Sequence, residues 1–241
     1  MSGSRRIKIL TIVALIIAIA SMSLGFAAFS ASLNISSSAA VAPNSSDFKM
    51  KIYGFDTEDN FADFMSKVFD YSEFDESLLS EDNSFAYTSR DNGATGTIAY
   101  IDNSTMSISN MNVTFTDASS QYVQYVFVIK NTGKYTAYLN VLDLEAANSN
   151  LVSSCEGLEG TTPALASAAC QDLEFKYVAG SSQGVSLDLL DIYIEPDDFI
   201  LFGFTWEYGV MGNAVLPDGP IKYTIENFHF PFTTAPNAIN D

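Results

Sequence analysis

Much of the chain alternates apolar and polar residues with a period of two, which is typical of β-strands that have one buried face. Within Ser109–Phe115, for example, Met111, Val113 and Phe115 are separated by Asn and Thr. The segment Tyr122–Lys130 is more continuously apolar, which predicts a central strand covered on both faces. Eight segments rich in β-branched and aromatic residues predict strands: Phe48–Tyr53, Thr97–Ile101, Met106–Thr116, Tyr122–Lys130, Tyr135–Leu144, Asp172–Val178, Phe199–Tyr208 and Ile221–Phe232.

The clearest turn signal between two of these strands is Asn131-Thr132-Gly133. Glycine has no Cβ and adopts positive φ without strain, as short hairpin loops often require. The sequence therefore predicts a hairpin in which Tyr122–Lys130 pairs with the strand that begins at Tyr135.

Two segments have helical periodicity instead. Glu58–Tyr71 places its apolar residues at helical spacing and has acidic residues in its first turn, as the helix dipole prefers. Pro163–Cys170 is rich in alanine, and Thr161 or Thr162 is a suitable N-cap before the proline. We therefore expect an all-β fold, a single β-sandwich domain over residues 47–232 with one or two short helical insertions, followed by a C-terminal tail over residues 233–241.

The first 27 residues have the three parts of a secretory signal: three basic residues, an apolar run, and small residues at a cleavage site. The pattern predicts that signal peptidase cuts between Ala27 and Ala28 and releases a secreted protein. The alternative is an uncleaved signal helix, because Ile9–Phe29 is long enough to cross a bilayer. In that case the signal segment would be the only contact with the membrane and would hold the domain at the cell surface.

Beyond this signal the chain is strongly acidic. The signal contains three of the 11 basic residues and no acidic residue, which leaves 8 basic against 29 acidic residues and a formal net charge of −21. Such a surface repels nucleic acid and anionic lipid, so neither is an expected partner. The 18 phenylalanines and 12 tyrosines distinguish the chain from acidic disordered segments and predict a folded core.

The chain has two cysteines, Cys155 and Cys170. An even number in an exported chain predicts a disulfide, which for a loop of this length stabilises by about 3 kcal/mol in the chain-entropy model. Two free, buried thiols are the alternative that the sequence leaves open.

Candidate catalytic chemistry is sparse. The one histidine, His229, lies in an aromatic strand and is better explained as a structural residue than as a general base. Trp206 also alternates with aromatic residues on a strand, and this position favours the core over a ligand platform. Acidic clusters at Asp56–Asp59 and Glu195–Asp198 have oxygen ligands that suit calcium but lack EF-hand spacing. We therefore expect no enzyme activity and no cofactor, with calcium as the remaining alternative.

The segment that follows the predicted cut alternates again. Its apolar residues are separated by Ser and Asn, and the run ends at Pro43. Residues 28–46 therefore contain an N-terminal strand and a linker. Such a strand forms an edge of its own domain or adds to the sheet of a neighbouring subunit. From the residues alone the first arrangement is preferred. The candidate donor-strand residues are Phe29, Ala31, Leu33, Ile35, Ala39 and Val41.

Two stretches resemble the TasA and camelysin family of bacterial biofilm-matrix and surface proteins. One is the signal ending Leu24-Gly-Phe-Ala-Ala-Phe-Ser30, and the other is Val126-Phe-Val-Ile-Lys-Asn-Thr-Gly-Lys-Tyr-Thr-Ala-Tyr-Leu139. The resemblance implies a jelly-roll-like sandwich, secretion and, in fibre-forming members, self-association by donor-strand exchange. It assigns the donor role to residues 28–41.

The camelysin-type metallopeptidase activity does not carry over, since the chain lacks a recognisable set of zinc ligands. The sequence thus favours a secreted structural protein of a matrix or surface fibre. The alternative is a monomeric cell-surface adhesin that binds a matrix or host-surface ligand through Trp206 or exposed tyrosines.

Overall fold

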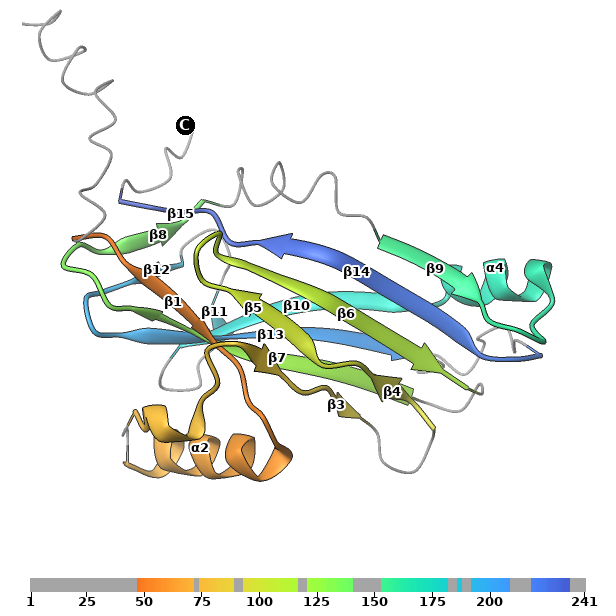
Figure 1. Cartoon of the computed structure of the whole chain (residues 1–241), viewed down its shortest axis with the longest axis horizontal. Helices are drawn as coiled ribbons and strands as arrows, with labels where there is room; N and C mark the ends of the chain where they lie inside the picture. The colour runs from red at the N-terminus through yellow and green to blue at the C-terminus, as the bar shows by residue number, and fades with distance from the viewer. Residues whose placement is uncertain are drawn as a thin grey trace, which may run out of the picture. The chain divides into compact units, whose positions relative to one another are not determined.

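The computed structural model describes residues 47–71, 74–88, 93–116, 121–140, 153–181, 186–187, 192–208 and 218–234. These residues form an all-β sandwich of antiparallel sheets with two α-helices (Figure 1). The predicted cleavage site at Ala27 and Ala28, the candidate donor strand and most of the C-terminal tail lie outside the described residues.

The first sheet is built on two long central strands, β7 (Gln121–Asn131) and β13 (Phe199–Tyr208), which pair over ten residues from Gln121↔Tyr208 to Lys130↔Phe199. On the far side of β13 lie β10 (Glu174–Ser181) and then β11 (Ser186–Leu187). Two short strands share the outer edge of β7. They are β1 (Met50–Tyr53), at the end of β7 near Asn131, and β3 (Tyr87–Thr88), near Gln124.

The second sheet has β6 (Ser107–Phe115) and β14 (Ile221–His229) at its centre. β9 (Ser153–Gly157) forms one edge, against β14, and β4 (Thr95–Gly96) and β5 (Ala99–Asp102) share the edge of β6, with β2 (Asn83–Ser84) beyond β5. A small third sheet joins β12 (Tyr193–Ile194), β8 (Ala137–Leu139) and β15 (Phe232–Thr233).

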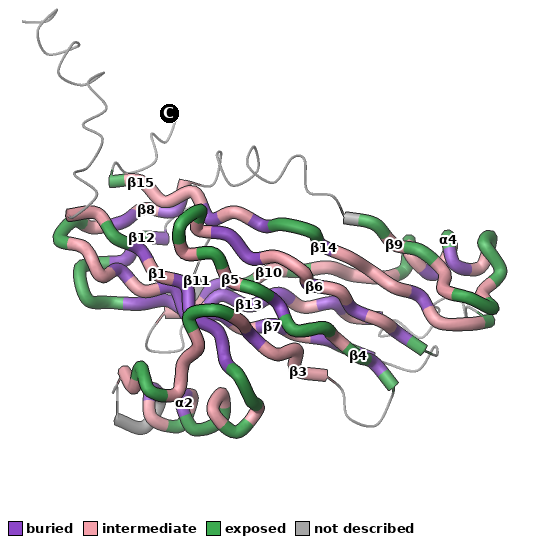
Figure 2. The backbone as a smooth tube through the Cα atoms, in the orientation of Figure 1, coloured by how far each residue is buried: buried purple, intermediate pink, exposed green. Residues whose placement is uncertain are grey.

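Buried residues follow the long strands of the first two sheets (Figure 2), and their core combines aliphatic side chains with a cluster of aromatic rings. Phe204 of β13 has ring contacts with Phe228 of β14 at 4.8 Å and with Phe127 of β7 at 5.9 Å. Phe202 faces Phe230 at 4.9 Å. Rings packed edge to face at these distances add stabilisation beyond the area that they bury, which explains how a chain of such high charge forms a compact sandwich.

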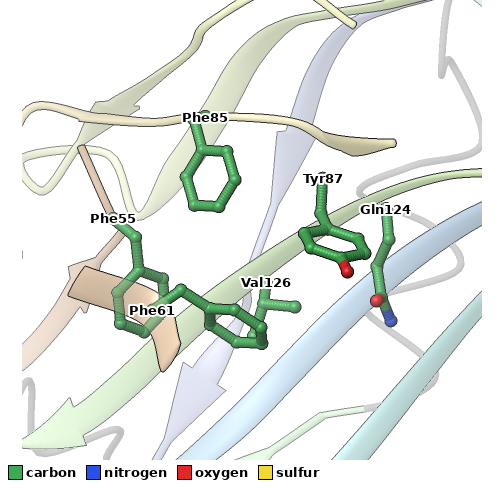
Figure 3. Close-up of a pocket in the computed structure, with 6 residues that line it drawn as sticks. All are labelled: Phe55, Phe61, Phe85, Tyr87, Gln124 and Val126. Carbon is green, nitrogen blue, oxygen red and sulfur yellow. The ribbon is translucent and has the colours of Figure 1, made fainter. Parts of the chain in front are cut away.

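The helix α2 (Glu58–Tyr71) covers part of the outer face of the first sheet. Phe64 and Val68 are buried there against Tyr53, Val128 and Phe199. After α2 follows a 3₁₀ turn, η1 (Glu76–Leu78). Beside the helix, a shallow recess is lined by side chains from α2, β3, β7 and the neighbouring loops, namely Phe55, Phe61, Phe85, Tyr87, Gln124 and Val126 (Figure 3).

The structure confirms the all-β sandwich and both predicted helices. α2 has the predicted bounds, and the second helix, α4 (Pro163–Gln171), extends one residue further than expected. Neither of these helices has the length and apolar character that a membrane-crossing helix needs, a finding that concerns the described residues alone.

The predicted hairpin is wrong. β7 lies in the first sheet, whereas β8 belongs to the third and pairs with β12 and β15. The side chain of Asn131, which is fully buried, explains the separation: its Nδ2 donates to the carbonyls of Tyr135 and Ile194, and its Oδ1 accepts from the N–H of Gly133. These bonds direct the chain away from β7, and β1 takes the edge that β8 was expected to occupy.

Candidate functional site

The outer edge of β1 combines a partly covered strand edge with an adjacent groove. Lys51 and Lys130 are direct partners in the β1–β7 ladder, and Lys49 accepts a hydrogen bond from the N–H of Thr132. In an antiparallel pair, main-chain groups alternate between the partner strand and the opposite side. The N–H and C=O groups of the even-numbered residues, from Phe48 to Gly54, therefore point away from β7.

The C-terminal half of this edge is covered. Gly54 forms a two-bond bridge with Ser80, with N···O distances of 2.7 and 2.9 Å. Ile52 is bound by the side chain of Asn103, whose Oδ1 accepts from the Ile52 N–H at 2.6 Å and whose Nδ2 donates to the Ile52 carbonyl at 3.1 Å. A single carboxamide thus takes the place of a neighbouring strand at Ile52.

The N-terminal half of the edge lacks such a cover within the described residues, and the Met50 side chain there packs into the core at 8% exposure. In the described part of the chain, neither Phe48 nor Met50 has a main-chain hydrogen-bond partner on this side. Their edge faces a groove of about 540 Å³, which we call the β1 groove. Its apolar wall is Phe48, Met50, Met106, Phe230, Pro231 and Phe232, and its polar rim is Lys49, Asn103, Ser104 and Thr105.

The β1 groove depends on the turn between β5 and β6. In the turn between β5 and β6, the carboxylate of Asp102 accepts hydrogen bonds from the hydroxyl and the N–H of Ser104, and these bonds lower the pKa of Asp102. They hold the turn in which Asn103 reaches Ile52. Met106 follows with a φ of 52°, and its carbonyl accepts from the N–H of Phe230. The turn therefore connects β1, through Asn103, with the segment at Phe230, through Met106.

Gly133 explains how the first residues of β1 are held. A Cβ atom on Gly133 would lie 2.6 Å from the Lys49 nitrogen and 2.7 Å from the Asp47 carbonyl oxygen. Gly133 is not among the described glycines with positive φ, so its predicted role in a left-handed turn is wrong. Here glycine permits close approach of two backbones, and the ion pair of Lys134 with Asp47 at 2.7 Å lies beside that contact.

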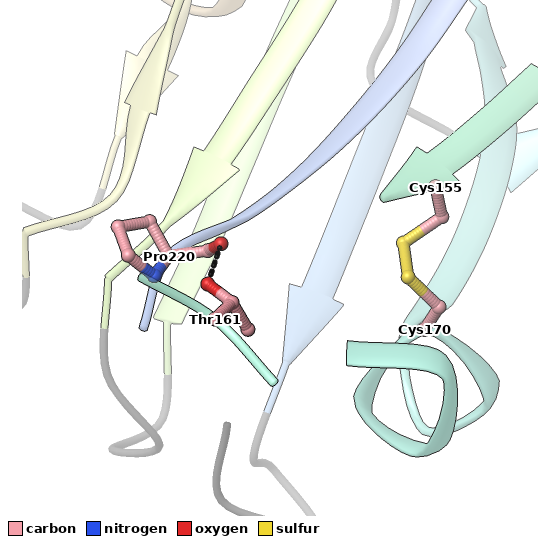
Figure 4. The surroundings of a disulfide bond; sticks show 4 residues. All are labelled: Cys155, Thr161, Cys170 and Pro220. Carbon is pink, nitrogen blue, oxygen red and sulfur yellow. Dashed lines mark hydrogen bonds between the residues drawn. A yellow bond between two sulfur atoms is a disulfide. The ribbon is translucent and has the colours of Figure 1, made fainter. Parts of the chain in front are cut away.

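The edge formed by β9 is built differently. Cys155 of β9 and Cys170 of α4 form a disulfide, with their Cα atoms 5.8 Å apart (Figure 4). The Cβ of Ala166 approaches Gly157 so closely that a Cβ on this glycine would lie 2.7 Å from it. Thr161 donates from its hydroxyl to the carbonyl of Pro220 at 2.9 Å, and Thr162 binds the carboxylate of Asp218 through its hydroxyl and its N–H. The disulfide and the Gly157 contact thus join α4 to β9, whereas the threonine bonds join the loop before α4 to the segment before β14.

The other residues considered from the sequence do not form a catalytic group. Trp206 is fully buried in the core between Tyr125 and Phe175, so it cannot serve as the ligand platform of an adhesin. His229 lies on β14 with its Nε2 2.9 Å from the Asn227 amide. Among the described residues, no three His, Cys, Asp or Glu side chains gather as a metal site.

Sequence reasoning missed the β1 groove as a site. Its walls come from residues 48–50, 103–106 and 230–232, which no local pattern connects. One signal was present: Phe48–Tyr53 was predicted as a strand, and a short strand at the start of a domain is a natural edge strand. Comparisons of the chain with protein-family models, with curated proteins and with solved structures give no match.

Proposed function

We propose that this chain is a secreted structural protein of a bacterial extracellular matrix or surface fibre, and that its copies associate by strand addition at the β1 groove. The observation that carries this proposal is the outer edge at Phe48 and Met50, which lies beside an apolar wall and has no main-chain partner among the described residues. In strand addition, main-chain hydrogen bonds supply affinity and pockets for alternate side chains supply specificity. The β1 groove offers both.

The donor in this proposal is the segment 28–41 of a second copy. Its apolar residues from Phe29 to Ile35 alternate with Ser and Asn, as one face of an added strand requires, and Ala39 and Val41 follow after three serines. The segment 28–46 contains no charged residue, although the chain has a net charge of −18. A neutral donor approaches an acidic neighbour without the repulsion that two acidic surfaces experience.

Cleavage by signal peptidase between Ala27 and Ala28 would free the donor segment outside the cell, which links export to assembly. An uncleaved signal would leave the same domain attached to the cell surface. The resemblance to the TasA and camelysin family supports the fibre function, and it also suggests that the strand connections are jelly-roll-like. A turn at Pro43 that returns the segment to its own groove is the competing arrangement, and it predicts a monomer.

The decisive experiment compares a chain that begins at Ala28 with one that begins at Ser45. We expect the longer chain to form concentration-dependent oligomers or fibres, measured by size-exclusion chromatography with light scattering and by electron microscopy. The shorter chain should remain monomeric because it lacks the donor. A longer chain that stays monomeric at every concentration and salt condition would refute the proposal.

A groove-filling substitution tests the acceptor. Thr105 is exposed at the groove rim, and Thr105→Trp places an indole where the donor would lie. We expect it to raise the concentration needed for assembly about tenfold or more, which corresponds to a loss of about 1.4 kcal/mol. Ile98→Trp is the matched control, because Ile98 is 53% exposed and is not part of the groove wall. Equal assembly of both variants would rule out the β1 groove as acceptor.

One observation favours the alternative of a surface adhesin. Tyr87 and Tyr122 stack at 6.1 Å on the outer face of the first sheet, next to the recess of Figure 3. Stacked aromatic side chains at a partly exposed site are typical of ligand-binding surfaces. This candidate predicts saturable binding of a matrix or host-surface ligand that Tyr87→Ala weakens without unfolding, whereas Trp206→Ala would act through loss of the core.

A further inference from the structure

We propose that Asn103 sets the register of the added strand by closing the acceptor edge at Ile52. The inference rests on the proposed function, because it assigns a specificity-determining residue to the same groove. An incoming strand would pair with Phe48 and Met50 and would end there. The next outward-facing residue, Ile52, is already bound through both its N–H and its C=O.

The donor segment by itself specifies its register poorly. Phe29, Ala31, Leu33 and Ile35 are all apolar and are spaced by two residues. A slip by two residues keeps every side chain on the same face of the sheet, so each apolar residue simply moves to the next pocket. Several registers would then have similar energies unless the acceptor edge has a defined end.

Asn103 is well placed to provide that end. Its Nδ2 also lies 3.3 Å from the carbonyl of Glu81, and the carboxylate of Glu81 binds Lys51 at 2.8 Å. The carboxamide is therefore held between β1 and the segment that precedes β2. Beyond it, Gly54 is closed by Ser80. The cover along β1 is continuous from Gly54 to Ile52 and stops beside Met50, where the groove begins.

Displacing Asn103 would cost an added strand more than the bonds at Ile52. Removing one partner from a hydrogen-bonded, partly buried polar group leaves that group unsatisfied, which is more expensive than the net value of the bond. An intruding strand would have to supply new partners for the carboxamide as well as for Ile52. Pairing limited to Phe48 and Met50 avoids this cost and selects one register.

Disulfide trapping measures the register directly. Chains that begin at Ala28 would carry Met50→Cys together with one donor substitution, Ala31→Cys, Leu33→Cys or Ile35→Cys. Residues opposite each other in a sheet approach closely enough to form a disulfide. With Asn103 present, we expect one donor position to give most of the cross-linked oligomer. With Asn103→Ala, we expect a second position, two residues away, to rise about tenfold to a comparable yield.

Asn227→Ala is the matched control, because Asn227 is an exposed asparagine whose amide contacts His229 and does not line the groove; it should keep the single register. Hydrogen exchange at the Ile52 amide supplies a readout that does not depend on assembly. In the chain that begins at Ala28, diluted until it is monomeric, Asn103→Ala should speed this exchange about tenfold, as the loss of one hydrogen bond predicts.

The outcomes separate the two proposals. Efficient cross-linking at the same single position in the presence and absence of Asn103 would overturn the role of Asn103 and leave the fibre function intact. Unchanged exchange of the Ile52 amide in Asn103→Ala would overturn it as well. If the chain that retains Asn103 neither assembles nor cross-links at any donor position, the proposed function is overturned, and the register inference with it.

Discussion

The edge strands β9 and β1, on two flanks of the sandwich, have different neighbours. An exposed strand edge offers unpaired main-chain groups to any other strand, and proteins usually block it. On the flank of β9, a disulfide joins the edge strand to α4. On the flank of β1, the cover consists of a bridge to Ser80 and one asparagine side chain, and it ends before Met50. In the described part of the chain, Phe48 and Met50 therefore have no main-chain partner on the outer side of β1.

Close backbone approach at glycine occurs on both flanks but has different consequences. Gly157 allows Ala166 of α4 to lie against β9, so a helix covers the strand. Gly133 allows the backbone of Asp47 and Lys49 to lie against the turn after β7, so the start of an edge strand is attached to that turn. The same residue type brings a helix against β9 on one flank and attaches the start of β1 on the other.

The largest expected effect on stability comes from removing the disulfide between β9 and α4. We expect the double substitution Cys155→Ser with Cys170→Ser to lower the free energy of unfolding by about 3 kcal/mol, because the disulfide restricts the unfolded chain. Urea unfolding of the chain that begins at Ser45 measures this, and Ser154→Ala on the same strand is the control. Self-association at the β1 groove should be unchanged. A variant as stable as the original would show that the disulfide does not secure this flank.

A smaller effect is expected on the flank of β1. Gly133→Ala introduces a Cβ against the backbone of residues 47–49, and we expect it to cost about 1–3 kcal/mol and to abolish assembly as β1 shifts. Gly203→Ala is the control, since its Cβ would meet its nearest neighbour at 3.5 Å, an ordinary contact. Circular dichroism melting and light scattering give the two readouts. Normal assembly of Gly133→Ala would contradict this account of how β1 is held.

The smallest effect concerns pH. Hydrogen bonds from the hydroxyl and the N–H of Thr162 lower the pKa of Asp218 below its ordinary value of 3.8. Because the folded pKa is the lower one, this stabilisation is complete above the ordinary value and is lost as pH falls through the folded pKa. Asp218→Asn should therefore be less stable than the unsubstituted chain at about pH 7, with a smaller difference at about pH 2.5.

Urea unfolding at the two pH values measures that difference. Asp102→Asn is the corresponding change near the β1 groove, where the hydrogen bonds from Ser104 lower the pKa of Asp102 in the same direction. It should show the same pH dependence and should also speed exchange of the Ile52 amide. A stability difference independent of pH would contradict the role of these carboxylates.

The spacing of apolar residues predicted helices and strands well where it followed a clear helical or strand period. Glu58–Tyr71 was expected as a helix and is α2 with the same bounds, since five apolar residues at helical spacing can bury only one face. Very short strands such as β3 and β4 were missed because two residues carry no period. The pairing of β7 with β8 failed because the buried Asn131 side chain, rather than the turn residues, directs the chain.

The sequence by itself determined the all-β class, the two helices, the acidic surface and the central position of Tyr122–Lys130, because each follows from composition or from periodicity within one segment. Only the tertiary structure decided which strand edges are closed. Asn103 lies 51 residues from Ile52 along the chain, and Pro231 lies farther still. An edge is covered or exposed through contacts between such distant segments, and these contacts exist only once both sheets have formed.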